Sequence, residues 1–322
     1  HAPGHRQRRR GDQIYAEESA VGQDAAFDIV GWTDSYSGAP IPAPEMAEWL
    51  DEAVTRIAAL NPRHVLETGC GTGMILHRIA GQVESYTGTD LSQTVLTRLA
   101  GSLPPGHGVQ LLHAPADDWA QLGARRFDTV ILNSVAQYFP DLAYLSDWLT
   151  EAIARIDTGA VFLGDLRNFA LAEAFQTSVA LHQAGQGATV ADLRRDVTRR
   201  LATEPELLID PAWFHAFASA HPRVRNLQVM PKEGRARNEL TRFRYDVVLE
   251  IGAAIDRRPE AWQTCADPAQ LQGLLARAAP RVALRDLPFA PPAGALAAVR
   301  LLRELPDGAP ARAAQAPEPA AT

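Results

Sequence analysis

The stretch Val65-Leu-Glu-Thr-Gly-Cys-Gly-Thr-Gly-Met74 places a glycine at every second position, directly after an apolar run. A strand that ends in glycines and leads into a helix presents unpaired backbone N–H groups and the positive end of the helix dipole, which suit a phosphate or nucleoside ligand. A dinucleotide fingerprint would need a glycine where Met74 stands, and a phosphate-binding P-loop would end in Gly-Lys-Ser or Gly-Lys-Thr. Neither motif fits this stretch, so another kind of nucleoside ligand is predicted.

Glu67 lies two residues before the first glycine, Gly69, and adds a negative charge to the loop. A carboxylate repels a pyrophosphate but attracts the amino group and the sulfonium of a zwitterionic ligand. We therefore predict that S-adenosylmethionine binds here. Cys70 is expected to fill space between the glycines. Because Cys70 and Cys265 are the only cysteines, we expect neither a disulfide framework nor a cysteine-based metal site.

The composition is that of a soluble globular protein. The chain of 322 residues is 46% hydrophobic and 21% charged, so it can bury a large core. Its formal net charge of -7 argues against a nucleic-acid partner, and the basic run Arg8-Arg-Arg10 is expected to be a solvated linker. No apolar run approaches the roughly 18 residues of a membrane-spanning helix, and no signal-peptide core is visible. We expect a cytoplasmic protein that contacts no membrane.

Strands and helices are predicted to alternate in the first half of the chain. Such alternation favours an α/β fold with a parallel sheet that has helices on both faces. The residues before this core are expected to form a linker (1–26) and a docking segment with one helix (27–63). The predicted strands are 64–67, 85–89, 109–113, 128–132 and 160–164, and the predicted helices are 44–60, 74–80, 93–100 and 143–156.

Two helices, 171–183 and 189–202, are predicted after the last of these strands. An insertion at this point would lie above the carboxyl ends of the strands, where ligands of open α/β sheets bind, so 169–210 is a candidate lid. A glycine-containing connection between 224–230 and 240–251 predicts an antiparallel hairpin that ends the core, 64–251. In the C-terminal extension, 252–305, we expect helix, strand and helix at 268–278, 281–284 and 294–302, packed on the sheet. The Ala- and Pro-rich residues 306–322 are expected to be a disordered tail.

Polar residues follow each of the first four predicted strands, at the sheet edge where ligands bind. Glu67 ends the first strand, and Asp90 ends the second, where a carboxylate can accept from ribose hydroxyls. Asp117 follows the third strand and can accept from an adenine amino group, while Asn133 and Tyr138 follow the fourth and would face a reactive methyl. Together these positions favour one cofactor site. Singly, a helix cap at Asp90, a turn at Asp117 and a core Tyr138 remain open.

Three stretches carry a family resemblance: residues 65–76, 127–140 and 238–248. They resemble the methyltransferase domains of nonribosomal peptide synthetases, and 27–42 resembles the segment that leads into those domains. The resemblance runs from about 27 to 251. It implies a Rossmann-like class I methyltransferase fold with a mostly parallel seven-stranded sheet. Such domains are often inserted into an adenylation domain and usually methylate the α-amine of an aminoacyl thioester on the phosphopantetheine arm of a peptidyl carrier protein.

The resemblance also assigns residues to the two halves of a site. Glu239 or Asp165 is expected to take the proton or orient the nucleophile, with Tyr138 lining the methyl path. A structural ion pair between Asp165 and Arg167, or a turn role for Glu239, is the alternative. The implied cofactor residues are Glu67, Gly69, Cys70, Gly71, Asp90, Leu91, Ala116, Asp117 and Asn133. The implied substrate-side residues are Asn133, Tyr138, Asp165, Glu239, Arg167, Asn238, Trp32 and Tyr36.

The sequence departs from the pattern of these domains at one place, and several alternative functions stay open. Near their C-terminus these domains tend to carry a Pro-Asn-Ala-Arg-like turn, where this chain has Leu287-Pro-Phe-Ala-Pro-Pro292, so docking or substrate choice is expected to differ. Asn133-Ser-Val-Ala does not fit the Pro-Pro motif of nucleic-acid amino-methyltransferases. Methylation of a side-chain hydroxyl or thiol, a freestanding small-molecule methyltransferase and a binding module without turnover stay open.

Overall fold

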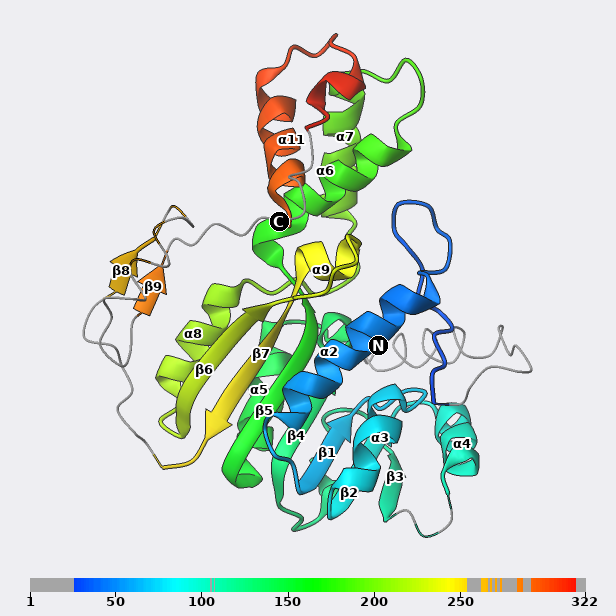
Figure 1. The fold of residues 1–322 in the computed structure, drawn as a ribbon, viewed down its shortest axis with the longest axis vertical. Coiled ribbons are helices and arrows are strands. Elements are labelled where there is room, and N and C mark those ends of the chain that lie inside the picture. The colour runs from blue at the N-terminus through cyan, green and yellow to red at the C-terminus, as the bar shows by residue number, and fades with distance from the viewer. Residues whose placement is uncertain are drawn as a thin grey trace.

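The computed structural model describes residues 26–104, 106, 108–253, 262–265, 267, 270, 273, 283–285 and 291–316. Its centre is a seven-stranded sheet in the order β3-β2-β1-β4-β5-β7-β6 (Figure 1). The strands from β3 to β5 are parallel, and β7 is antiparallel to both of its neighbours. The predicted mostly parallel sheet with an antiparallel hairpin is thus confirmed. The strands are β1 (His64–Thr68), β2 (Ser85–Asp90), β3 (Val109–His113), β4 (Phe127–Asn133), β5 (Ile156–Arg167), β6 (Val224–Pro231) and β7 (Arg244–Ile251).

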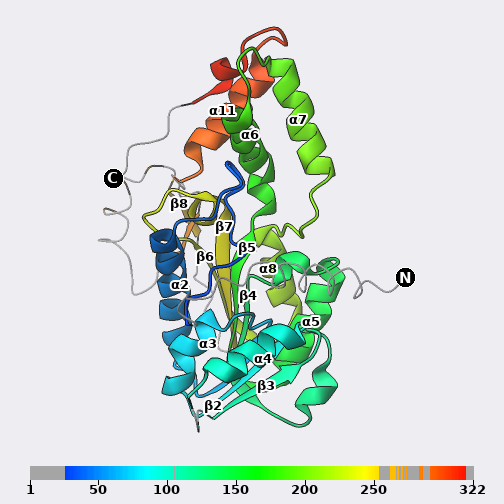
Figure 2. The ribbon, with the colours of Figure 1, turned by 90° about the vertical axis from the view of Figure 1, so that its right-hand side faces the viewer.

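Helices cover both faces of the sheet, which Figure 2 shows nearly edge-on. On one face, α2 (Ala43–Ala58), α3 (Met74–Ile79) and α4 (Gln93–Ser102) bury an apolar cluster against β1 and β2. On the other, α5 (Leu142–Ala154) and α8 (Pro211–Ala220) bury a second cluster against β4, β5 and β7. Burial on both faces explains the unbroken apolar runs of β4 (130–132) and β5 (160–163).

A group of helices stands above the carboxyl ends of the parallel strands (Figure 1). The predicted helices of the insertion are present as α6 (Ala172–Gln183) and α7 (Val190–Ala202), and α7 begins with a capping box formed by Thr189 and Asp192. Together with α11 (Ala293–Glu304) and the 3-10 helix η5 (Ala311–Ala314) they form what we call the helical cap. The expectation that the last helix packs on the sheet was wrong, because Ala295 and Val299 of α11 pack against Phe175 and Val179 of α6.

Residues 306–316 also differ from the prediction, since they do not form a disordered tail. Ala309 O accepts from Val190 N (2.9 Å), and Ala311 N donates to Ala188 O (2.8 Å). Ala311 and Ala314 are 4% and 0% exposed against the cap helices. A composition of alanine and proline suggests disorder, but small side chains also allow close packing on a helix. Residues 317–322, the linker at 1–25 and most of the predicted helix 268–278 lie outside the described residues. Part of the predicted strand 281–284 appears as β9 (Ala283–Arg285), paired with β8 (Trp262–Thr264) in a separate parallel pair.

We expect Ala314→Asp to loosen the helical cap, because it buries a carboxylate that has no partner. Ala313 is exposed in the same turn, so Ala313→Asp is the matched control. Hydrogen exchange of the α7 amides should speed up by at least about tenfold in the first variant and stay unchanged in the second. Equal protection of α7 in both variants would contradict the packing of η5 on the cap.

Candidate active site

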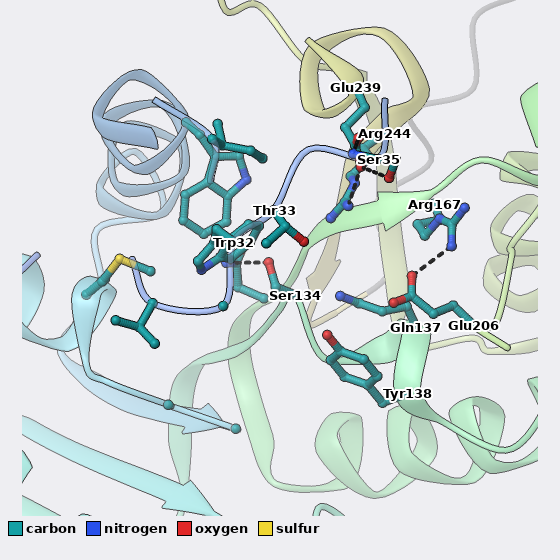
Figure 3. Close-up of a pocket in the computed structure, with 18 of the residues that line it drawn as sticks. Trp32, Thr33, Ser35, Ser134, Gln137, Tyr138, Arg167, Glu206, Glu239 and Arg244 are labelled. Carbon is teal, nitrogen blue, oxygen red and sulfur yellow. Dashed lines mark hydrogen bonds and ion pairs between the residues drawn. The ribbon is translucent and has the colours of Figure 1, made fainter. Parts of the chain in front are cut away.

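One cavity of about 440 Å³ lies at the carboxyl ends of β1 and β4, where the strand order reverses. Its walls come from segments far apart in the sequence: the glycine loop after β1, the turn after β4, the N-terminal residues 28–41, the helical cap and the start of β7. In Figure 3, Ser35, Glu239 and Arg244 lie on one side of the cavity and Tyr138 on the other. A single space therefore connects the predicted cofactor loop with the predicted substrate side.

The glycine loop is held in a backbone shape that other residues rarely adopt. Gly69 and Gly73 have φ angles of 72° and 85°, in the left-handed region. A Cβ at Gly69 would lie 2.5 Å from Val135 Cγ2, and a Cβ at Gly73 would lie 2.4 Å from Leu99 Cδ1. The backbone N–H groups of Gly69 and Cys70 both donate to Thr89 O, at 2.8 and 2.9 Å. The loop thus packs tightly between β2 and the turn after β4.

Glu67 is a buried carboxyl in the cavity wall, 4% exposed. Burial raises its pKa to about 8, a hydrogen bond from Tyr86 opposes the rise, and the charge of Asp90 adds to it. The Tyr86 hydroxyl lies 2.6 Å from Glu67 Oε2. The charged form of a carboxyl buried in this way is strongly stabilised by a cationic ligand, because attraction to the ligand charge replaces the hydration lost on burial.

Four predicted cofactor residues, Asp90, Leu91, Ala116 and Asp117, do not line this cavity. Asp90 supports the loop instead, since its carboxylate accepts from Gly71 N (2.9 Å) and Ser92 N (2.8 Å). Ser92, not Asp90, is the N-cap of α4. Asp117 bonds the Tyr144 side chain. The roles of these four residues in cofactor binding stay predictions.

Glu239 reaches the cavity from the first turn of the short helix α9 (Glu239–Phe243) and is 5% exposed. Its two oxygens accept from Ser35 N (2.7 Å) and Ser35 Oγ (2.9 Å), and Arg244 Nη2 lies 3.7 Å away. Asn238 does not line the cavity. It caps α9 by accepting from Leu240 N (2.9 Å). Asn238 therefore fixes the helix start that presents Glu239.

Asp165 is 0% exposed and does not line the cavity. Its carboxylate accepts from Trp49 Nε1 (3.2 Å), Ser134 Oγ (2.8 Å) and Arg244 Nη1. This placement gives no direct path for a proton from a substrate. The alternative ion pair with Arg167 is also absent, because Arg167 bonds Glu204 (2.8 Å) and Glu206 (2.8 Å) at the cavity wall.

The remaining predicted residues divide between the cavity and its surroundings. Tyr138 lines the cavity and is 44% exposed, so it is not a core residue. Asn133 also lines it, and within the described part of the chain its buried Oδ1 has no hydrogen-bond partner. Trp32 lines the cavity and packs on Trp49 with ring centroids 4.7 Å apart. Tyr36 lies outside the lining and bonds Ser178 Oγ through its hydroxyl (2.8 Å).

Several cavity residues escaped the sequence analysis. Ser35, Ser134 and Arg244 lie in stretches that carried the resemblance, and the run Glu204-Pro-Glu206 comes just after α7, so each offered a local signal. The contacts of the first three were missed because their partners are distant in sequence. The missed lining residues with polar side chains include Thr33, Ser35, Ser134, Gln137, Gln176, Arg200, Glu204, Glu206 and Arg244.

The glycine-loop end of the cavity fits S-adenosylmethionine. Glu67 offers a buried carboxyl to a cation, and Asn133 Oδ1 is a buried acceptor that no group of the described residues bonds. Glu67, Gly69, Cys70, Gly71 and Asn133 would hold the cofactor at this end. Among the described residues, no group of three His, Cys, Asp or Glu side chains could hold a metal ion. Within the same part of the chain, no helix is long and apolar enough to span a membrane.

The pKa of Glu67 predicts that S-adenosylmethionine binds more tightly as the pH rises from 6 to 8. The free protein holds this carboxyl protonated below about pH 8, whereas a sulfonium stabilises the carboxylate, so binding releases a proton. The dissociation constant should fall by at most about tenfold per pH unit and level off above pH 8. Calorimetric titration tests this, with Glu67→Gln as the control that should bind weakly and without the slope. A pH-independent wild-type constant would contradict the assignment.

Comparison with known proteins agrees with this geometry. The family described as "Methyltransferase domain" matches residues 66–162. Chondramide synthase of Chondromyces crocatus is 43% identical over 240 residues, which are 73% of this chain and 6% of that protein. Beauvericin nonribosomal cyclodepsipeptide synthetase of Beauveria bassiana is 40% identical over 240 residues, which are 72% of this chain and 7% of that protein. The chain thus spans only a small part of these relatives.

Solved structures are similar to the chain only distantly. Magnesium protoporphyrin IX methyltransferase from Synechocystis is 15% identical, with a TM-score of 0.45 over 78% of this chain and 94% of that one. At this level the match carries no information on function. On the family match and the synthetase relatives, the chain belongs to the S-adenosylmethionine-dependent methyltransferase domains of nonribosomal peptide synthetases.

Proposed function

We propose that this protein transfers a methyl group from S-adenosylmethionine to the α-amine of an aminoacyl group held as a thioester on a peptidyl carrier protein. The observation that carries the proposal is the single cavity in which the Glu67 end and the Glu239 end meet. Methyl transfer requires the nucleophile to lie in line behind the bond between sulfur and methyl, so donor and acceptor must share one space. The extent of the match to peptide synthetases supports a tethered aminoacyl acceptor.

The charges on the acceptor side suit an amine. Glu239 is buried, and Ser35 holds both of its oxygens in place. Such a carboxylate attracts the ammonium form of an α-amine and can accept its proton, directly or through a water molecule. Tyr138, on the opposite side of the cavity in Figure 3, lines the path of the methyl group. When bound, S-adenosylmethionine supplies an electrophilic methyl group, and the protein supplies position and charge.

The dimensions of the cavity suit an acceptor that enters on a flexible arm. Its volume of about 440 Å³ is within the range of about 300–1,000 Å³ of small-molecule sites, so a carrier protein must stay outside while its phosphopantetheine arm reaches in. We propose a peptidyl carrier protein as the partner that delivers the substrate. An adjoining adenylation domain is the second proposed partner, since the relatives are multidomain synthetases by their length and name.

Intact-mass analysis tests the function. Carrier proteins loaded with different amino acids are incubated with the protein and S-adenosylmethionine, and fragmentation locates the added methyl group. We expect one methyl on the α-nitrogen of a loaded carrier and none on free amino acids. A methyl on a side-chain oxygen or sulfur would correct the acceptor. Turnover of free small molecules without any carrier product would favour a freestanding small-molecule methyltransferase.

Glu239→Gln should reduce methyl transfer by about 100-fold or more, the usual loss when a general base is removed, and leave cofactor affinity nearly unchanged. Glu250 of β7 is a matched control, because it bonds Asn226 and Arg225 and does not line the cavity. Turnover and calorimetric binding of S-adenosylhomocysteine are measured for Glu239→Gln and Glu250→Gln. Equal loss of turnover and cofactor binding in the first variant would refute the role of Glu239 on the substrate side.

A further inference from the structure

We infer that Asp165 is a positioning residue of the acceptor side, which holds Arg244 away from Glu239 and fixes three side chains of the cavity wall without touching the substrate. The inference rests on the proposed role of Glu239, and the experiment below separates the two. It replaces the expectation from the sequence that Asp165 itself accepts a proton.

The three partners of Asp165 come from three different elements, and all of them line the cavity while Asp165 does not. Trp49 belongs to α2, Ser134 to the turn after β4 and Arg244 to the start of β7. Their donor atoms converge on one carboxylate, at 3.2 Å for Trp49 Nε1 and 2.8 Å for Ser134 Oγ, with Arg244 Nη1 bonded as well. The Asp165 carboxylate thus orients three side chains of the cavity wall.

Asp165 is itself held firmly in an unusual conformation. Its φ angle is 62°, in the left-handed region that few residues other than glycine, asparagine and aspartate occupy. The irregular pairing of β5 with β7 between Leu163 and Leu166 accompanies this conformation. Asp165 N donates to Asp246 Oδ1 at 2.8 Å, and Asp246 is anchored by Lys232 (2.8 Å) and Arg56 (2.8 Å). A strained backbone that its surroundings keep in place favours a functional requirement at this residue.

Arg244 is shared unequally between two carboxylates. It bonds Asp165 directly, whereas its Nη2 stays 3.7 Å from Glu239 Oε1. Burial would lower the pKa of Arg244, but the charge of Asp165, helped by Glu239 and Glu206, raises it above its ordinary value, so the guanidinium stays charged. Because Arg244 pairs with Asp165, its positive charge does not neutralise Glu239. The negative charge of the Glu239 carboxylate therefore remains available to an amine. Without the charge of Asp165, the guanidinium would move to Glu239 and neutralise it.

The test uses Asp165→Asn, with Glu250→Gln as the control. Glu250 lies on β7, bonds Asn226 and Arg225, and neither contacts Asp165 nor lines the cavity. Turnover is measured as S-adenosylhomocysteine formed with loaded carriers and with free amino acids, so the comparison uses whichever acceptor the wild type methylates. The affinity for S-adenosylhomocysteine and the unfolding midpoint in urea are measured on the same variants.

We expect Asp165→Asn to lower kcat by about 100-fold, the order of loss that a misplacement of about 1 Å causes. Its dissociation constant for S-adenosylhomocysteine should stay within about threefold of the wild type, and Glu250→Gln should keep kcat near the wild-type value. Adding Arg244→Met to Asp165→Asn should raise kcat by about tenfold over Asp165→Asn alone, because the guanidinium that neutralises Glu239 is removed. Such a departure from additive effects is expected only for coupled residues.

Three results would overturn the inference: a kcat that falls as far in Glu250→Gln as in Asp165→Asn, a loss of cofactor affinity as large as the loss of kcat in Asp165→Asn, or no recovery in the double variant. The proposed function is tested separately by Glu239→Gln. If that variant keeps full turnover, the function of Glu239 fails, while the comparison of Asp165→Asn with the double variant still decides whether Asp165 restrains Arg244.

Discussion

The antiparallel pairing of β7 with β5 is the constraint on which the rest of the site depends. It places Arg244 against Asp165 at the carboxyl end of the parallel strands, and the helix that precedes β7 carries Glu239 to the same edge. A sheet that remained parallel throughout would bring the start of β7 to the opposite edge, away from the glycine loop. The reversal of one strand therefore joins the acceptor side to the cofactor side.

Buried carboxylates around this pairing are bonded on every side. Asp246 is paired with Lys232 and Arg56, and Asp165 with Arg244, whereas Glu239 accepts hydrogen bonds from the neutral Ser35. Removing one partner of such a cluster leaves a charge without solvent or counterion, which typically costs about 3–5 kcal/mol. The acceptor side is consequently rigid before any substrate arrives, and preorganised charge of this kind is the main means by which enzymes stabilise transition states.

Much of the fold followed from the sequence, because its signals are local. The alternation of apolar runs and amphipathic helices predicted the parallel strands, and the glycine-containing connection after 230 predicted the hairpin of β6 and β7. Glu67, Gly69 and Gly71, predicted to bind the cofactor, line one cavity because they lie at the end of β1 and in the loop that follows it. The sequence did not predict that residues 306–316 are ordered on the helical cap. Their alanines pack on a surface that is formed by residues distant in sequence, so no local pattern signals the contact.

The acceptor side could be predicted only in part, for the same physical reason. Ser35 binds Glu239 across 204 residues of sequence, and Trp49 binds Asp165 across 116. Neither periodicity nor a local motif predicts contacts between residues so far apart in sequence. The resemblance to peptide synthetases singled out Asp165, Asn238 and Tyr36, but it did not show that they contact residues of the cavity wall without lining the cavity themselves.

A crystal structure of the protein with S-adenosylhomocysteine and an aminoacyl-pantetheine thioester would show whether donor and acceptor share one space. We expect both molecules in the one cavity, with the α-amine between Glu239 and the sulfur of the cofactor product. The nitrogen and the sulfur should be separated by a near-attack distance of about 3–3.5 Å plus the length of the missing bond from sulfur to methyl. A thioester bound outside the cavity, or an amine that points away from the sulfur, would contradict this expectation.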